Sequence, residues 1–190
     1  IKGARALQAS CVYPVAEGLE VYTNSPAVRE ARKVTLELIL SNHERKCLTC
    51  IRNRNCELQK LSEELGIEEV RFDGYNPHFE IDNMSPSIVR DNNKCILCRR
   101  CVAACKNQGI SVIDCVERGF NTHIAPYFEK PINDAACIYC GQCIVACPVG
   151  ALYEKNDIPK VNDAIDDDDK HVVVQVAPAV RAALGEEFGL

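Results

Sequence analysis

CILCRRCVAAC at residues 95–105 and CIYCGQCIVACP at residues 137–148 are two copies of one cysteine pattern. Each copy reads C-x2-C-x2-C-x3-C, and the same distance along the chain separates every cysteine of the first copy from its counterpart in the second. Four equal separations indicate an internal repeat. Three thiolates in one tight loop can wrap one face of a metal cluster, so the fourth must come from a distant segment.

This spacing is the one that holds 4Fe-4S clusters in two-cluster ferredoxins, where the fourth cysteine of each run binds the other cluster. The repeat therefore predicts two crossed ligand sets and an electron-transfer activity. One set is Cys95, Cys98, Cys101 and Cys147, and the other is Cys137, Cys140, Cys143 and Cys105. Pro148 follows the second run as in the bacterial pattern, whereas Lys106 replaces that proline in the first.

Zinc is the main alternative metal, because paired C-x2-C knuckles also make tetrahedral sulfur sites. A zinc ribbon needs two cysteines per knuckle, and each run supplies four. Disulfides are a second alternative. However, 13 is an odd number of cysteines, no signal peptide is visible, and close triplets of cysteines suit a metal cage in a reducing compartment. We therefore expect iron-sulfur clusters in both runs.

A third motif upstream reads H-x3-C-x2-C-x5-C, and its residues are His43, Cys47, Cys50 and Cys56. Three thiolates plus one imidazole suit a 4Fe-4S cluster with a histidine ligand. A neutral imidazole makes the site less negative than a fourth thiolate would, so its reduction potential should rise, as in Rieske centres. The alternative is that His43 is a surface histidine at a helix end. The three correctly spaced cysteines behind it favour a ligand.

The segment before this motif has the pattern of an amphipathic helix. Ser25 suits the N-cap, Pro26 suits the first helical position, and residues 41–42 end the pattern. A shorter helix is expected over residues 57–66, followed by a turn-rich linker over 67–84.

Two cysteines lie outside these motifs. Cys115 matches no ligand spacing and is expected to be a core thiol in a strand. Cys11 lies in QASCVYPVAEGLEVYTNSP, which resembles the end of a plant-type 2Fe-2S domain, where an isolated fourth cysteine closes a site whose other three ligands lie far upstream. Those three are absent here, and a lone cysteine is otherwise more often a small buried hydrophobe. The resemblance favours Cys11 as a 2Fe-2S ligand.

The composition excludes some functions. The 22 basic residues against 27 acidic ones give a net charge of −5, which offers no basic footprint for nucleic acid. No apolar run approaches membrane-spanning length. We expect a cytoplasmic redox protein, in which bound clusters supply much of the folding energy.

The order of the motifs resembles the electron-relay half of an FeFe hydrogenase catalytic subunit, of the multi-subunit, electron-bifurcating NAD(P)-linked type. After the cysteine motifs, residues 171–176 read as a buried strand, and VAPAVRAALGEEFG at 176–189 resembles the start of the domain that carries the H-cluster. The chain thus looks like an interior slice of a larger protein. The segment 117–143 resembles the NAD(P)-linked members. Complex I-type and formate dehydrogenase subunits share the cysteine motifs, so the motifs alone do not distinguish these classes from FeFe hydrogenases. Residues 176–189 are the segment that distinguishes them.

The resemblance implies that electrons pass between an NAD(P)H and flavin partner, or ferredoxin, and the H-cluster, for reversible H2 oxidation and proton reduction. It implies three 4Fe-4S clusters here, a 2Fe-2S cluster in the full-length protein, and the H-cluster in the following domain. No cysteine follows Cys147, so this chain cannot hold the H-cluster and has no predicted catalytic residue. A flavin subunit and a small 2Fe-2S subunit are the implied partners. The alternative is a non-catalytic ferredoxin-like relay subunit of a complex I-type or formate dehydrogenase assembly.

We therefore predict an α+β protein with little regular structure. It should combine the end of a 2Fe-2S domain, a small helical 4Fe-4S domain and a bacterial-type two-cluster ferredoxin domain. The expected segments are the 2Fe-2S domain end at 1–24, the histidine-ligated domain at 25–66, a linker at 67–84, the two-cluster domain at 85–155, an acidic linker at 156–170 and the start of the H-cluster domain at 171–190.

Overall fold

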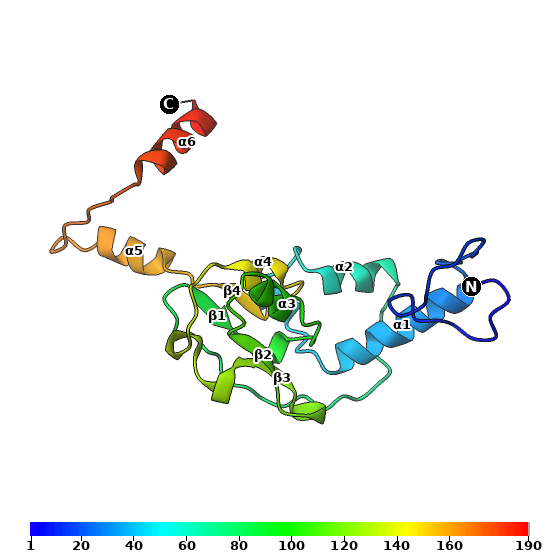
Figure 1. Cartoon of the computed structure of the whole chain (residues 1–190). Helices are drawn as coiled ribbons and strands as arrows, with labels where there is room; N and C mark the ends of the chain where they lie inside the picture. The colour runs from blue at the N-terminus through cyan, green and yellow to red at the C-terminus, as the bar shows by residue number, and fades with distance from the viewer. Residues whose placement is uncertain (190) are drawn as a thin grey trace. The chain divides into compact units, whose positions relative to one another are not determined.

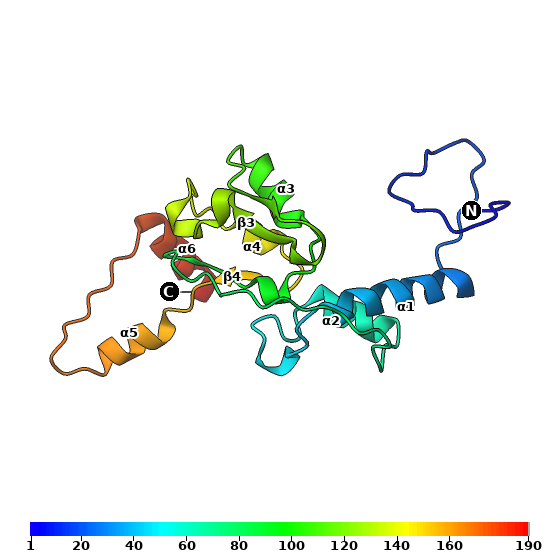
Figure 2. The same cartoon turned by 90° about the horizontal axis from the view of Figure 1, so that it is seen from below.

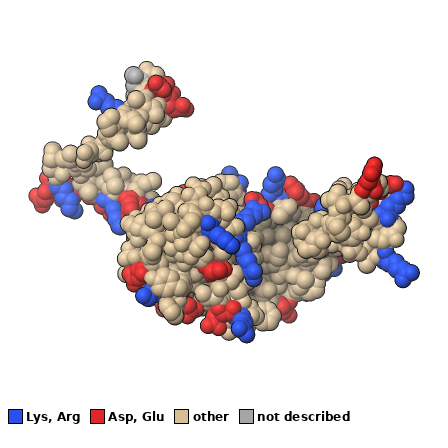
Figure 3. All heavy atoms as spheres, in the orientation of Figure 1, with Lys and Arg blue, Asp and Glu red and all other residues tan. Residues whose placement is uncertain are grey.

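The computed structural model describes residues 1–189 and divides into two compact units, the first covering residues 1–155 and the second beginning at Asn156 (Figures 1 and 2). Leu190, which ends the predicted H-cluster segment, lies outside the described residues. Regular structure is sparse, as the sequence predicts, and consists of short helices, 3-10 turns and two separate two-stranded sheets. No helix within residues 1–189 is long and apolar enough to cross a membrane. On the face drawn in Figure 3, basic and acidic side chains are interspersed over the surface of the molecule.

Helix α1 runs from Pro26 to Ser41 and confirms the predicted amphipathic helix. The Ser25 hydroxyl accepts a hydrogen bond from the backbone N–H of Val28 at 3.4 Å, which caps the otherwise unpaired donors of the first turn. Leu36 and Leu40 are buried. Helix α2, Glu57–Glu64, buries Leu58 and lies within the predicted second helix.

The cysteine repeat folds into paired elements. Helices α3, Arg100–Asn107, and α4, Gln142–Ala146, come from the two runs and pack against each other. Strand β1, Ile88–Arg90, pairs antiparallel with β4, Leu152–Glu154, and so joins the two ends of this region.

Between the runs, strand β2, Ile113–Val116, pairs antiparallel with β3, His123–Pro126. Cys115 lies in β2, half-buried against the hydrophobic core, as predicted. The core between these elements is largely aliphatic, and its most buried members include Ile88, Ile113, Ile124, Ile132, Val149 and Leu152.

Residues 67–84 form no helix, and this segment holds α1 against the two-cluster region. Arg71 donates two hydrogen bonds to the buried carboxylate of Glu37 in α1, at 2.7 and 3.0 Å. Further along, the side-chain amide of Asn76 donates to the backbone oxygen of Ser41 at 3.1 Å, at the end of α1. The predicted linker therefore has a structural role, because it fixes the end of α1 from which the histidine motif begins.

The second unit contains helix α5, Ile158–Ile165, and helix α6, Pro178–Phe188. Helix α5 lies inside the segment predicted as an acidic linker, and α6 begins at a proline. The predicted buried strand over residues 171–176 is wrong. Val173 and Val174 are 76% and 79% exposed, and the described part of the chain supplies no strand to pair with this segment. A strand needs such a partner to satisfy its backbone groups.

Gly74 is required where the segment 67–84 crosses the end of α1. A Cβ atom at this position would overlap the backbone oxygen and carbon of Ser41, which cannot move without displacing the helix end. We predict that Gly74→Ala lowers the free energy of unfolding by about 1–3 kcal/mol. Thermal denaturation of the cluster-loaded protein, followed by circular dichroism, measures the change, and an unchanged melting temperature would contradict the packing described.

Candidate iron-sulfur sites

The first crossed set of cysteines lies around one cavity, which we call the Cys95 site. Its wall contains all four predicted members, with apolar side chains such as Ile96, Ile124 and Val149 between them. Cys101, on α3, and Cys147, just after α4, are buried. Cys98 is exposed, so one edge of the cavity lies near the protein surface.

The second set lies around another cavity, which we call the Cys137 site. Cys105 at the end of α3 joins Cys137, Cys140 and Cys143 there, and the rest of the wall is aliphatic. Cys140 is the exposed member of this set, as Cys98 is in the first. The structure thus groups the cysteines of the two runs as the crossed pattern requires, with one thiol exchanged in each direction.

The repeat extends to the backbone that positions the thiols. Leu97 and Tyr139, two residues after the first cysteine of each run, both adopt a left-handed conformation with φ of 54°. In both runs this conformation lets the backbone N–H donate to the sulfur of that first cysteine, Cys95 or Cys137, at 3.4 Å. Hydrogen bonds to ligand sulfur help to set the reduction potential of a cluster. The chain therefore carries donors already directed at the sulfur atoms.

Burial changes the acidity of these thiols. It raises the pKa of Cys95 to about 11, of Cys101 to about 12 and of Cys143 to about 11, and neighbouring cysteines of the same set add to the effect. At neutral pH the buried thiols therefore keep their protons unless a cation replaces them. Metal binding must release these protons, so loading should become more favourable as the pH rises.

The third motif surrounds its own cavity, which we call the His43 site. His43, Cys47, Cys50 and Cys56 all line it, together with Leu40 of α1 and Leu58 of α2. The imidazole follows the end of α1, Cys47 begins a 3-10 turn, and Cys56 is the residue before α2. Two helix ends and one turn thus bring three thiols and one imidazole to a single cavity.

The ring of His43 fits a metal-ligand role. Its Nδ1 is buried and has no hydrogen-bond partner among residues 1–189. Burial lowers the pKa of His43, more than the carboxylate of Glu44 raises it, so the ring is neutral at physiological pH. A neutral imidazole is the form that binds a metal. A buried nitrogen without a partner costs free energy that a metal bond would remove.

The described residues do not form a cage for a single metal ion. In that part of the chain, no three His, Cys, Asp or Glu side chains converge closely enough to hold one. A zinc site requires sulfur atoms about 2.3 Å from one ion. A cubane instead binds its thiolates at separate corners, so it accepts a more open arrangement of cysteines. Each of the three cavities is lined by four candidate ligands, the number that the four iron corners of a cubane require.

Cys11 remains isolated. It is exposed in the loop before α1, and the described residues lining its groove, among them Tyr13, Val15 and Tyr22, include no second cysteine and no histidine. Its assignment to a 2Fe-2S cluster therefore stays a prediction.

Sequence reasoning missed the junction between the His43 site and the Cys95 site. The backbone N–H of Glu57, next to Cys56, donates to the oxygen of Pro148, next to Cys147, at 3.0 Å. The side chain of Arg100 makes an ion pair with Glu57 at 2.7 Å. Ligand-bearing segments of the two sites are thus one hydrogen bond apart.

Gly150 completes this junction. A Cβ atom there would lie 2.7 Å from the sulfur of Cys50, too close for van der Waals contact. In the sequence this glycine indicates only a turn after the second run. The sequence carries no signal for the close approach of Gly150 to Cys50, because the two residues lie far apart along the chain.

Two protein-family descriptions match the chain. The NADH-ubiquinone oxidoreductase-G iron-sulfur binding region matches residues 32–71, which include the His43 site. The 4Fe-4S dicluster domain matches residues 94–151, which include both cysteine runs. These matches establish 4Fe-4S binding domains in the two parts of the chain.

Relatives include both hydrogenases and NADH dehydrogenases. The NADP-reducing hydrogenase subunit HndD of Solidesulfovibrio fructosivorans is 46% identical over 100% of this chain and 33% of its own length. Iron hydrogenase 1 of Clostridium pasteurianum is 38% identical over 97% of the chain and 32% of its own length. An NADH-quinone oxidoreductase subunit of Rhizobium meliloti is 37% identical over 80% of the chain and 18% of its own length.

A solved structure agrees with these matches. A chain in the crystal structure of an NAD+-reducing [NiFe]-hydrogenase in the H2-reduced state superposes with a TM-score of 0.73 and 31% identity, over 78% of this chain and 64% of that one. The present chain spans about a third of the length of its hydrogenase relatives.

The exchanged thiols generate a prediction. Cys147→Ser should damage the cluster of the Cys95 site and leave that of the Cys137 site largely intact, although Cys147 belongs to the second run. Electron paramagnetic resonance of the reduced protein separates the two signals. Cys105→Ser is the matched control and should damage the other cluster. Damage to the cluster of the mutated run in both variants would contradict the exchange.

The imidazole generates a second prediction. His43→Cys should keep a cluster at the His43 site but lower its midpoint potential, because a thiolate adds negative charge and resists reduction. His43→Ala should leave an iron without its protein ligand and prone to loss. A redox titration of each variant measures the change, and potentials equal to that of the unmodified protein would show that His43 is not a ligand.

Proposed function

Because the chain belongs to the iron-sulfur electron-transfer family that includes NAD(P)-linked hydrogenases and NADH-quinone oxidoreductase subunits, we propose that it is the electron-relay portion of an FeFe hydrogenase. The chain would carry electrons, and H2 would be activated outside it, at an H-cluster in the domain that would follow. The proposed partners are a flavin subunit that oxidises NAD(P)H, a small 2Fe-2S subunit, and ferredoxin as an alternative electron donor.

The extent of the matches supports a hydrogenase in particular. The two hydrogenase relatives align over 100% and 97% of the chain, whereas the NADH-quinone oxidoreductase subunit aligns over 80%. About a fifth of the chain therefore has a counterpart in the hydrogenases that the other relative lacks. The cysteine motifs are common to both classes, so this extra similarity carries the choice between them.

We assign a 4Fe-4S cluster to each of the three sites. Such clusters, when bound, accept and donate single electrons at potentials that the surrounding protein tunes. The protein supplies the thiols of the Cys95 and Cys137 sites, the three thiols and the imidazole of the His43 site, and largely apolar walls around the Cys95 and Cys137 sites. Cys11 would ligate a 2Fe-2S cluster with residues of an upstream segment.

The contacts between sites support an order for the relay. The His43 site meets the Cys95 site through the Glu57–Pro148 hydrogen bond, and the Cys95 site meets the Cys137 site through the packing of α3 on α4. We propose that electrons pass through the three sites in this order, or in reverse.

A second candidate is a relay without hydrogen chemistry. The family description for residues 32–71 names NADH-ubiquinone oxidoreductase-G, and the superposed crystal structure belongs to an enzyme with a different, nickel-containing hydrogenase centre. The chain would then be part of a non-catalytic subunit of a complex I-type or formate dehydrogenase assembly, and no H-cluster would follow it.

Anaerobic reconstitution tests the relay itself. The chain should bind about twelve irons and as many sulfides, distributed over three 4Fe-4S clusters that are reduced one electron at a time. Iron and sulfide analysis with electron paramagnetic resonance measures this, and stoichiometric zinc without iron would refute it. In the complete protein, H2-dependent reduction of a viologen dye that is lost in Cys147→Ser supports the hydrogenase. Reconstitution of the clusters without any reaction with H2 supports the second candidate.

A further inference from the structure

We propose that the ammonium group of Lys94 is a fixed positive charge that raises the reduction potential of the cluster at the His43 site. The inference deepens the proposed function and rests on it, because it requires a redox cluster at that site. Lys94 directly precedes Cys95 in the sequence, yet its side chain lies beside Gly150, close to Cys50 of the other site. It would act through its charge and not as a ligand.

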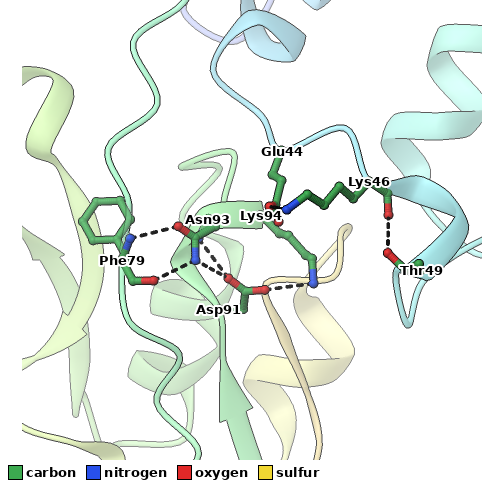
Figure 4. A network of polar contacts seen from close by, with 7 residues as sticks. All are labelled: Glu44, Lys46, Thr49, Phe79, Asp91, Asn93 and Lys94. Atoms are coloured by element: carbon green, nitrogen blue, oxygen red, sulfur yellow. Dashed lines mark hydrogen bonds and ion pairs between the residues drawn. The ribbon is translucent and has the colours of Figure 1, made fainter.

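The charge is held in place by a buried ion pair. The Lys94 ammonium lies 2.8 Å from the carboxylate of Asp91, and these two side chains are only 16% and 2% exposed. Asn93 fixes the other oxygen of Asp91 with its backbone N–H and its side-chain amide, at 3.1 and 2.9 Å. The side-chain amide of Asn93 also donates to the backbone oxygen of Phe79, and its side-chain oxygen accepts from the backbone N–H of Phe79, as Figure 4 shows. Lys94 therefore projects from a network that restricts its movement.

The lysine side chain reaches the wall of the His43 site through Gly150. A Cβ atom on Gly150 would lie 2.7 Å from the sulfur of Cys50 and 3.5 Å from Cδ of Lys94, so the glycine lets the thiol and the lysine approach the same point. The backbone N–H of Glu44, next to His43, also donates to the oxygen of Asn93, at 3.4 Å. Lys94 thus precedes a ligand of one site in the sequence, while its side chain approaches Cys50 of the other site beside Gly150.

Lys94 stays charged in this environment. Its ammonium lies 2.8 Å from the Asp91 carboxylate, and an opposite charge at this distance favours the charged form of the lysine.

The sign of the effect follows from electrostatics. Reduction adds one negative charge to a cluster, so a nearby cation stabilises the reduced state more than the oxidised state and raises the potential. Low exposure reduces the screening of this charge by solvent and salt. Removing the ammonium would also leave the Asp91 carboxylate without its cation, and this change lowers the potential further.

Two variants of the ion pair test the proposal. In the anaerobically reconstituted chain at one fixed pH, Lys94→Gln should lower the midpoint potential of the His43-site cluster, and Asp91→Asn should raise it. Lys94→Arg keeps the charge and should restore a potential close to the original one. The cluster of the Cys137 site should not shift in any variant. Redox titration followed by electron paramagnetic resonance reads all three clusters in the same sample.

Lys46 provides a matched control. It directly precedes Cys47, just as Lys94 precedes Cys95, and it is paired with Glu44 at 2.6 Å, but its side chain is 72% exposed. Figure 4 draws both lysines. Because water screens the exposed charge, Lys46→Gln should shift the potential much less than Lys94→Gln.

Each outcome decides the proposal. Opposite shifts in Lys94→Gln and Asp91→Asn support it, since damaged packing would not change sign with the charge removed. Shifts in the same direction, no shift, or an equal shift in Lys46→Gln would overturn it. If Lys94→Gln fails to assemble clusters, a higher potential in Asp91→Asn together with a nearly unchanged potential in Lys94→Arg supports the proposal. Any other result in these two variants would overturn it. An unmodified chain that binds no clusters would instead refute the proposed function together with the tuning role.

Discussion

The exchange of one thiol between the two cysteine runs is the constraint on which the first unit depends. Cys147 can join the cavity of the first run only if the end of α4 lies against α3, and Cys105 can join the other cavity only under the same condition. The antiparallel pairing of β1 with β4 then closes the region, because these strands flank the two runs in the sequence. One exchange thus specifies both cavities, the helix packing and the sheet.

The thiols are also part of the hydrophobic core. Cys101 and Cys147 are buried together with the aliphatic residues around them, and burial keeps the pKa of Cys101 far above neutrality. Without a metal both side chains pack as small apolar groups. With a metal they become anions whose charge the bound iron offsets. Folding and cluster binding are therefore coupled, which is consistent with the small amount of regular structure.

The His43 site is attached to this core by specific local contacts. Gly150 allows Cys50 to approach the second run, and Glu57 bonds the backbone of Pro148. The segment 67–84 holds α1 through Arg71 and Asn76. Electron transfer requires clusters at short and constant separations, and these contacts maintain the position of the His43 site. They also place the buried Lys94–Asp91 pair at the boundary between two sites.

The sequence by itself determined the number of candidate sites and the residues that could form them, because metal sites impose short, fixed spacings. The two runs predicted crossed cysteine groups, and the Ser25 and Pro26 signals predicted where α1 begins. Local patterns of this kind depend only on neighbouring residues. The strand predicted over 171–176 failed for the same reason, since a run of valines indicates β-structure but cannot supply the partner that a strand requires.

Only the tertiary structure decided how the His43 site meets the repeat and which charges lie between them. In the sequence, Lys94 and Lys46 each directly precede a cysteine. In the structure, Lys94 is buried in an ion pair, whereas Lys46 is exposed. Burial depends on segments far apart in the chain, such as those of Cys50 and Gly150, and no local spacing encodes their approach.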